Sequence, residues 1–179
     1  IGMLYIKKGI KLIPQLNGGA QERNRRAGTE NVPGIMGFKK ACELVEKNRQ
    51  KSVEKNTFLR DKLINGIESK IDHVTLNGPR GNKRLSNNVN FCFDFIEGES
   101  ILLNLDILGI AASSGSACTS GSLEPSHVLL AIGHTKATAH GSLRLSLGEN
   151  NTEDEIDFVL DKLPGIIQRI RDMSPLYNK

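Results

Sequence analysis

Residues 113–122 combine one reactive thiol with side chains that are too small to form a core. Gly, Ala, Ser and Thr surround the single sulfur of Cys118. Such a segment buries little apolar area, so we expect a loop that moves as a unit. A thiol on such a loop becomes a nucleophile when it loses its proton. The alternative is a disordered linker that carries Cys118 incidentally.

Arg144 lies in a segment where apolar and polar residues alternate. In residues 142–148 the leucines share one face, and Ser142, Arg144 and Ser146 share the other. This alternation predicts a strand from which Arg144 points away from the core. An arginine held on a strand can bind a carboxylate through two parallel hydrogen bonds, which suits recognition of an amino acid. The alternative role for Arg144 is a surface salt bridge.

Thr29 lies in a long polar loop, residues 17–31, with glycines at both ends. Loops of this length inside compact domains are often functional. Residues 1–28 contain six Lys and Arg side chains against one Glu, a balance of +5. This cationic loop with a hydroxyl suits an anion such as the phosphate of a cofactor or of nucleic acid. Simple solvation explains Lys7, Lys8 and Lys11 equally well.

We predict no chemical role for the other two cysteines. Cys42 falls in an apolar stripe at helical spacing, which predicts a small core residue. Cys92 falls on the less apolar face of an alternating strand, and we assign it no role. Three cysteines without a pairing pattern argue against a disulfide framework and for a reducing, cytoplasmic setting.

The sequence predicts no metal site. Cys118, His127, His134 and His140 are separated by eight, six and five residues, which matches no standard zinc spacing. A Cys/His hydrolase would need a local nucleophile signature around Cys118, and none is present. We expect the three histidines to lie at the surface or at helix ends.

Composition describes an ordinary globular chain. It has 179 residues, 38% of them apolar and 25% charged, which is enough for one good core. No apolar run approaches the roughly 18 residues that span a bilayer, so we expect no membrane segment. Only 4% of residues are aromatic, which disfavours a stacking platform for nucleic acid.

Hydrophobic periodicity predicts the elements that position these residues. From residue 35 onward helices and strands alternate in the order of a single α/β domain. Short extended segments at residues 2–6 and 13–16 precede it. The last helix begins with a capping box at Thr152 and has Pro164 inside it, where we expect a kink. The remaining predictions are helices over 35–67, 101–108 and 126–132, a brief strand at 110–112, and a strand over 88–95 whose aromatic residues, Phe95 included, face the core.

Several motifs in order resemble one family. Residues 114–121 (SGSACTSG) resemble the cysteine loop of group I NifS/IscS-type cysteine desulfurases, which are pyridoxal-phosphate (PLP) enzymes. The similarity continues in residues 18–23 (GGAQER), 26–34 (RAGTENVPG), 126–129 (SHVL) and 141–148 (GSLRLSLG). It covers essentially the whole chain.

The resemblance implies a role for each of the three candidate residues. Cys118 would attack the sulfur of L-cysteine, which leaves a persulfide on the protein and releases alanine. Arg144 would bind the substrate carboxylate. Thr29 would donate a hydrogen bond to the PLP phosphate of the other subunit in a homodimer. An iron-sulfur scaffold or another acceptor protein would then take the sulfur.

The resemblance also implies a fold. Residues 1–34 would be the end of the large PLP-binding domain of a fold type I transferase, and residues 35–179 its small C-terminal α/β domain. The lysine that binds PLP covalently would precede this chain, because Lys7, Lys8 and Lys11 do not match its motif. We therefore expect the chain alone to be inactive.

Three other functions stay open at this point. A PLP enzyme of the same fold that acts on selenocysteine would share these motifs. A non-enzymatic sulfur carrier or scaffold-binding module would use Cys118 only as an acceptor. A nucleic-acid-binding module would use the basic N-terminal residues, and its binding would fall steeply with salt.

Overall fold

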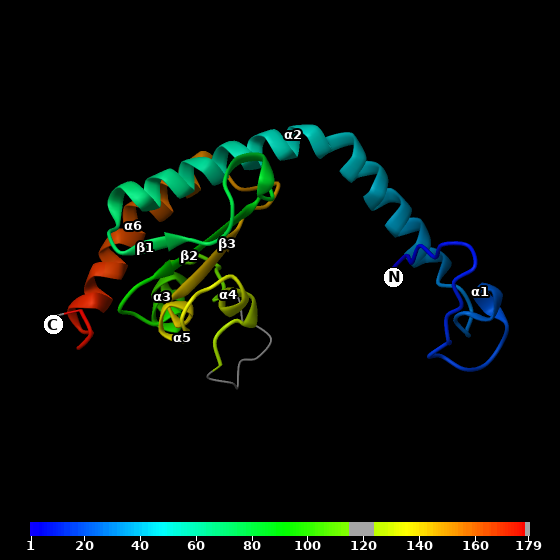
Figure 1. The fold of residues 1–179 in the computed structure, drawn as a ribbon. Coiled ribbons are helices and arrows are strands. Elements are labelled where there is room, and N and C mark those ends of the chain that lie inside the picture. Colours follow the sequence, from blue (N-terminus) through cyan, green and yellow to red (C-terminus); the bar gives the residue numbers. More distant parts are fainter. Residues whose placement is uncertain (115–123, 178–179) are drawn as a thin grey trace. The chain divides into compact units, whose positions relative to one another are not determined.

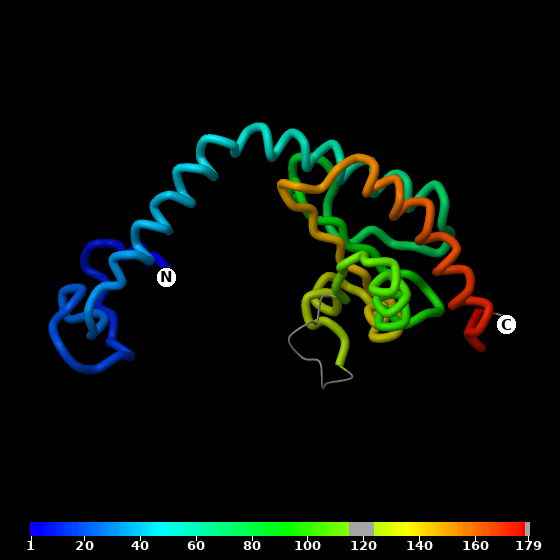
Figure 2. Tube along the Cα trace, turned by 180° about the vertical axis from the view of Figure 1, so that it is seen from behind, coloured from blue at the N-terminus to red at the C-terminus, as the bar shows by residue number. Residues whose placement is uncertain are grey.

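The computed structural model describes residues 1–114 and 124–177 (Figures 1 and 2). The chain divides into two compact units, Ile1–Gln50 and Lys51–Lys179. Helix α2, Val32–Lys70, has residues in both units. The division after residue 34, which rests on the resemblance, stays a prediction.

The first unit contains the short helix α1, Gln21–Asn24, and the beginning of α2. The prediction of strands at residues 2–6 and 13–16 is wrong, because neither segment forms regular structure. A strand needs hydrogen bonds from a neighbouring strand, and no described strand pairs with these segments. None of the described residues 1–50 is buried.

Three antiparallel strands form the sheet of the second unit, in the order β1-β2-β3. They are β1 Val74–Leu76, β2 Asn88–Phe93 and β3 Ser142–Ser146. β2 and β3 confirm the strands that alternation predicted there. Arg144 of β3 lies opposite Asn90 of β2. On the other edge of β3, Ser113 forms an isolated bridge with Arg144.

Helices α2, α3 (Gly98–Ile107) and α6 (Glu153–Asp172) bury the main core against one face of this sheet. α6 runs beside the second half of α2 (Figures 1 and 2), and Lys62 of α2 binds Glu153 of α6 at 2.7 Å. Large apolar side chains that are almost fully buried in this core include Leu59, Leu63, Ile67, Val89, Phe91, Phe93, Ile101, Leu105, Leu143, Leu163 and Ile167.

The opposite face of the sheet carries a smaller cluster. Short helices α4, His127–Ala131, and α5, Lys136–His140, lie on this side (Figure 1). Their residues Leu129 and Ala139 pack with Cys92 of β2.

A 3-10 turn, Gly81–Lys83, precedes β2. Within the described residues, no helix is long and apolar enough to span a membrane.

α6 confirms the predicted capping box and apolar stripe. The Thr152 hydroxyl accepts from the Glu155 backbone, and the Glu155 carboxylate accepts from the Thr152 backbone. The helix continues through Pro164, which has no N–H for the carbonyl of Leu160. Lys70 of α2 donates to that carbonyl instead, at 3.2 Å. The side chain of one helix thus satisfies a backbone group that proline leaves unpaired in the other.

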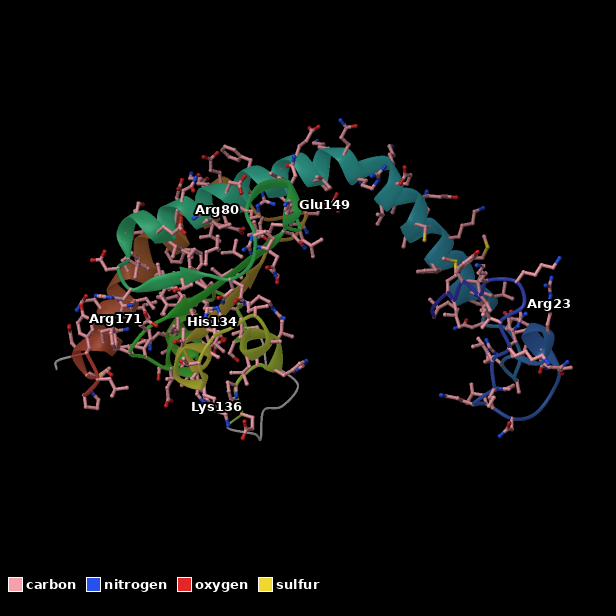
Figure 3. All side chains as sticks on the ribbon, in the orientation of Figure 1. Arg23, Arg80, His134, Lys136, Glu149 and Arg171 are labelled. Atoms are coloured by element: carbon pink, nitrogen blue, oxygen red, sulfur yellow. The ribbon has the colours of Figure 1, made fainter. Side chains whose placement is uncertain are left out.

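Two local predictions are wrong. Residues 110–112 form no strand, because pairing with β3 begins only at Ser113. Phe95 does not face the core: β2 ends at Phe93, and Phe95 adopts a φ of 70° and is 38% exposed. Its ring instead meets His73 edge-on at 5.5 Å. The side chain of Arg171 in α6, labelled in Figure 3, is buried. It donates to the carbonyls of His73 and Asp94.

Candidate active site

Strand β3 holds Arg144 as the alternation predicted. Leu143 and Leu145 are buried in the core, at 2% and 6% exposure. The strand pleat turns Arg144 to the opposite face, where it is half-buried. A guanidinium on a paired strand has a fixed origin, which is what recognition of a small anion requires.

The guanidinium of Arg144 has a weak partner inside the protein. Its Nη2 lies 3.4 Å from the hydroxyl of Ser113. No carboxylate of the described residues forms an ion pair with Arg144, and residues 115–123 contain no Asp or Glu. The described structure therefore gives no support to a salt bridge as the role of Arg144.

Ser113 and Ser114 run along the outer edge of β3. The Ser113 amide donates to the Arg144 carbonyl at 3.0 Å, and the Arg144 amide donates to the Ser113 carbonyl at 2.5 Å. The hydroxyl of Ser142 donates to the Ser114 carbonyl at 2.7 Å. The residues that directly precede the segment containing Cys118 are thus bound beside Arg144.

Cys118 itself lies outside the described residues, within 115–123. The described chain resumes at Glu124, which forms an ion pair of 3.7 Å with Lys136 at the start of α5. Lys136 is labelled in Figure 3. The role of Cys118 stays a prediction, but the structure describes the residues on either side of segment 115–123.

The thiol of Cys92 is unsuited to nucleophilic chemistry. Cys92 is fully buried. Burial raises the pKa of this thiol above its usual value, and the nearby carboxylate of Asp94 adds to the rise, whereas a hydrogen bond from Asn77 opposes it. Because the thiolate is the reactive form, Cys92 stays protonated and inert at neutral pH.

The prediction that Cys42 is a core residue is wrong. Its side chain is exposed on α2, and Ile35 and Val45 of the same stripe are 41% and 64% exposed. Helical periodicity identifies which residues share a face. It does not show that another element covers that face.

The loop at residues 17–31 is folded by its own side chains. Glu22 and Arg23 of α1 adopt left-handed backbone angles, with φ of 47° and 57°. The amide of Gly28, at φ 98°, donates to the Gln21 side chain at 3.1 Å. Arg26 donates to the carbonyls of Gly28 and Thr29 at 2.8 and 3.3 Å. These contacts determine the local conformation of the loop.

Thr29 fits the phosphate of PLP by its chemistry. It is exposed, and its hydroxyl has no hydrogen-bond partner among the described residues. The Arg26 guanidinium binds the adjoining backbone, so a positive charge lies next to this hydroxyl. A hydroxyl donor beside a cation is a suitable donor set for a phosphate. Thr29 and Arg144 belong to different compact units.

Two residues next to Arg144 were missed by sequence reasoning. Ser113 and Ser142 make the contacts that bring residues 113–114, which precede the segment containing Cys118, to β3. A partial signal was present, because strand alternation places Ser142 and Arg144 on one face. The pairing partner of β3 on its outer edge could not be read from that alternation.

No group of three or more His, Cys, Asp or Glu side chains within residues 1–114 and 124–177 could hold a metal ion. A cavity of about 750 Å³ lies near the end of α6, between Asp94 and Glu97 on one side and Met173 and Leu176 on another. Neither Arg144 nor Ser142 lines this cavity.

The sheet and the helices packed on it form the mixed α/β fold of NifS-like PLP-dependent transferases. The chain belongs to the class-V aminotransferase family, which matches residues 1–159. Cysteine desulfurase IscS of Clostridium botulinum is 57% identical over 178 residues, which cover 99% of this chain and 45% of that protein. Cysteine desulfurase IscS of Methanosarcina thermophila is 56% identical over 178 residues, or 99% of this chain and 44% of that protein.

Solved structures agree. A NifS-like protein superposes with a TM-score of 0.79 and 33% identity, covering 92% of this chain and 41% of that protein. The resemblance to NifS/IscS-type cysteine desulfurases and the α/β fold of PLP-dependent transferases are therefore confirmed. The chain spans about half the length of the curated relatives that it matches.

Proposed function

We propose that this chain supplies the sulfur-accepting thiol and the substrate carboxylate site of a PLP-dependent cysteine desulfurase. The names of its relatives support this activity. The observation that carries the proposal is the pairing of Ser113 with Arg144, because it brings the start of the Cys118 loop to the arginine. Nucleophile and substrate anchor thereby belong to one site.

Arg144 binds the α-carboxylate of L-cysteine. Its guanidinium offers two parallel N–H donors in a fixed fork, which matches a carboxylate. Among the described residues, the hydroxyl of Ser113, at 3.4 Å from Nη2, is the side-chain group that competes for that fork. Substrate binding at Arg144 fixes the amino acid while leaving its side-chain sulfur free to meet Cys118.

Cys118 removes the sulfur. Its thiolate forms a new S–S bond to the substrate sulfur, and the substrate C–S bond breaks. The electrons of that bond stay on the substrate carbon, which takes up a proton. The product is then released as alanine. PLP, when bound, supplies the electron sink that allows this bond to break. The protein keeps the sulfur as a persulfide on Cys118.

Thr29 holds the phosphate of PLP in the other subunit of a homodimer, with Arg26 supplying positive charge nearby. The persulfide sulfur then passes to an iron-sulfur scaffold or another acceptor protein in the cytoplasm. None of Lys7, Lys8 and Lys11 matches the motif that binds PLP covalently. The 179-residue chain with PLP alone is therefore expected to release no alanine from L-cysteine.

A chimera tests the function of these residues. The chain replaces the matching residues of the Clostridium botulinum IscS, with which it shares 57% identity. We expect PLP-dependent release of alanine from L-cysteine and one added sulfur on Cys118 by mass spectrometry. Cys118→Ser is expected to abolish both, with Cys42→Ser as the matched control, because Cys42 is an exposed thiol outside the proposed site.

The outcomes separate the alternatives. A chimera that releases no alanine contradicts the desulfurase. A Cys118→Ser chimera that still releases alanine contradicts a persulfide mechanism and favours a lyase of the selenocysteine type. If the 179-residue chain takes up sulfur on Cys118 from an intact desulfurase while its chimera is inactive, the sulfur-carrier function is the better description.

A further inference from the structure

Ser142 carries a buried hydroxyl with a single defined contact. The residue is 2% exposed, and its Oγ donates to the carbonyl of Ser114 at 2.7 Å. A buried hydroxyl that loses its partner is costly, so such contacts persist in the folded state. Ser114 is the last described residue before the segment that contains Cys118. The hydroxyl of Ser142 therefore holds the start of the Cys118 loop.

Close backbone packing fixes the position of Ser142. A Cβ on Gly141 would overlap the carbonyl oxygen of Phe93, and a Cβ on Gly98 would overlap the carbonyl oxygen of Ser142. The Phe93 amide also donates to the Gly141 carbonyl at 2.9 Å. The two glycines thus let neighbouring backbones approach residues 141 and 142 closely. The Ser142 hydroxyl starts from a rigid backbone.

The same strand fixes Arg144 relative to this contact. Ser142 and Arg144 are two residues apart on β3, which places their Cα atoms about 6.6 Å apart on one face. Two backbone hydrogen bonds join Arg144 to Ser113, next to the carbonyl that Ser142 holds. Strand geometry therefore sets the distance from the guanidinium to the start of the loop.

We propose that Ser142 is a positioning residue for sulfur transfer, which fixes where the Cys118 loop begins relative to the substrate carboxylate at Arg144. This role rests on the proposed function. It requires no contact between Ser142 and substrate. Loss of the hydroxyl frees the Ser114 carbonyl while Arg144 keeps its own place on the strand. The change should therefore affect the reaction of bound cysteine more than its binding.

Hydrogen exchange in the 179-residue chain tests the contact without any catalytic assay. In Ser142→Ala we expect the Ser113 amide to exchange about fivefold faster, since one neutral hydrogen bond beside it is lost. Ser142→Thr retains a hydroxyl and should restore slow exchange. Ser146→Ala is the matched control, because Ser146 lies on the same face of β3 but is exposed. In Ser146→Ala, the Ser113 amide should exchange as fast as it does in the parent chain.

Kinetics in the chimera test the role. For Ser142→Ala we expect kcat to fall about tenfold or more and KM for L-cysteine to stay unchanged. The reason is that a small misplacement of the reacting groups slows the reaction strongly. Ser142→Thr should recover much of the loss, and Ser146→Ala should behave like the parent. A purely structural role would lower the amount of folded enzyme and leave kcat per bound PLP unchanged.

Each result decides between distinct conclusions. Faster exchange together with a lower kcat at constant KM supports the role. An unchanged kcat, unchanged exchange, or an equal loss in Ser146→Ala overturns the role of Ser142 while the desulfurase stands. An inactive parent chimera overturns the proposed function and this role with it.

Discussion

Arg144→Lys perturbs the proposed carboxylate site with little change elsewhere. Lysine keeps the positive charge, and the two backbone hydrogen bonds to Ser113 do not depend on the side chain. The substitution removes the planar fork of donors that binds both oxygens of a carboxylate. It therefore isolates the geometry of recognition from the charge.

The magnitude follows from the donors that are lost. A hydrogen bond to a charged group contributes about 1.5–3 kcal/mol, and an ammonium replaces the two-donor fork by one point charge. Losing one of two such bonds costs about 2 kcal/mol, which is about a 30-fold fall in kcat/KM. Substrate and transition state use the carboxylate contact alike, so most of the fall should appear as a higher KM.

The assay is steady-state release of alanine by the chimera over a range of L-cysteine concentrations. Arg80→Lys is the matched control. Arg80 is an arginine of the same compact unit, labelled in Figure 3, whose exposed side chain pairs with Glu68. Its substitution should leave KM unchanged. Circular dichroism should show the same fold for both variants.

Three results would refute this reasoning. An unchanged KM in Arg144→Lys means that the fork does not bind the carboxylate. A fall confined to kcat means that Arg144 acts on the reaction and not on binding. An equal rise of KM in Arg80→Lys means that the effect is one of general charge.

Three further predictions concern burial, close packing and capping elsewhere in the chain. Iodoacetamide at pH 8 should label Cys42 in the native 179-residue chain but leave Cys92 unlabelled until denaturant is added, because burial raises the pKa of Cys92; native labelling of Cys92 would contradict its assignment as inert. Gly141→Ala should lower the free energy of unfolding in urea by about 3 kcal/mol or more, since the new Cβ overlaps the Phe93 carbonyl; a loss below about 1 kcal/mol would mean that the strands move apart easily. Thr152→Ala should cost about 1 kcal/mol through loss of the capping box, which the same titration measures; no change would show that the helix end is held by packing alone.

Local signals in the sequence predicted much of the second unit correctly. Alternation gave β2 and β3, and with them the outward face of Arg144. The capping box and 3.6-residue stripe gave α6. In each case the residues that determine the element lie within a few positions of one another, so the pattern is complete in the sequence.

The errors have a common physical cause. Residues 2–6 are apolar but have no strand beside them among the described residues, and Cys42 is exposed although its stripe is apolar. Phe95 continues the alternation of β2, yet the chain turns away at a positive φ. A sequence pattern shows which side chains of a segment could be buried together. Whether they are buried depends on which other element packs against the segment.

The sequence alone determined the chemistry available to this protein: one thiol among small residues, one arginine in an alternating segment and one hydroxyl in a basic segment. It also determined the family, because the motifs are contiguous. Tertiary structure alone decided that the edge of β3 binds Ser113 and Ser114, so that a buried serine and the arginine lie next to the start of the Cys118 loop. Those contacts join residues about thirty positions apart, and long-range pairing depends on how whole elements pack.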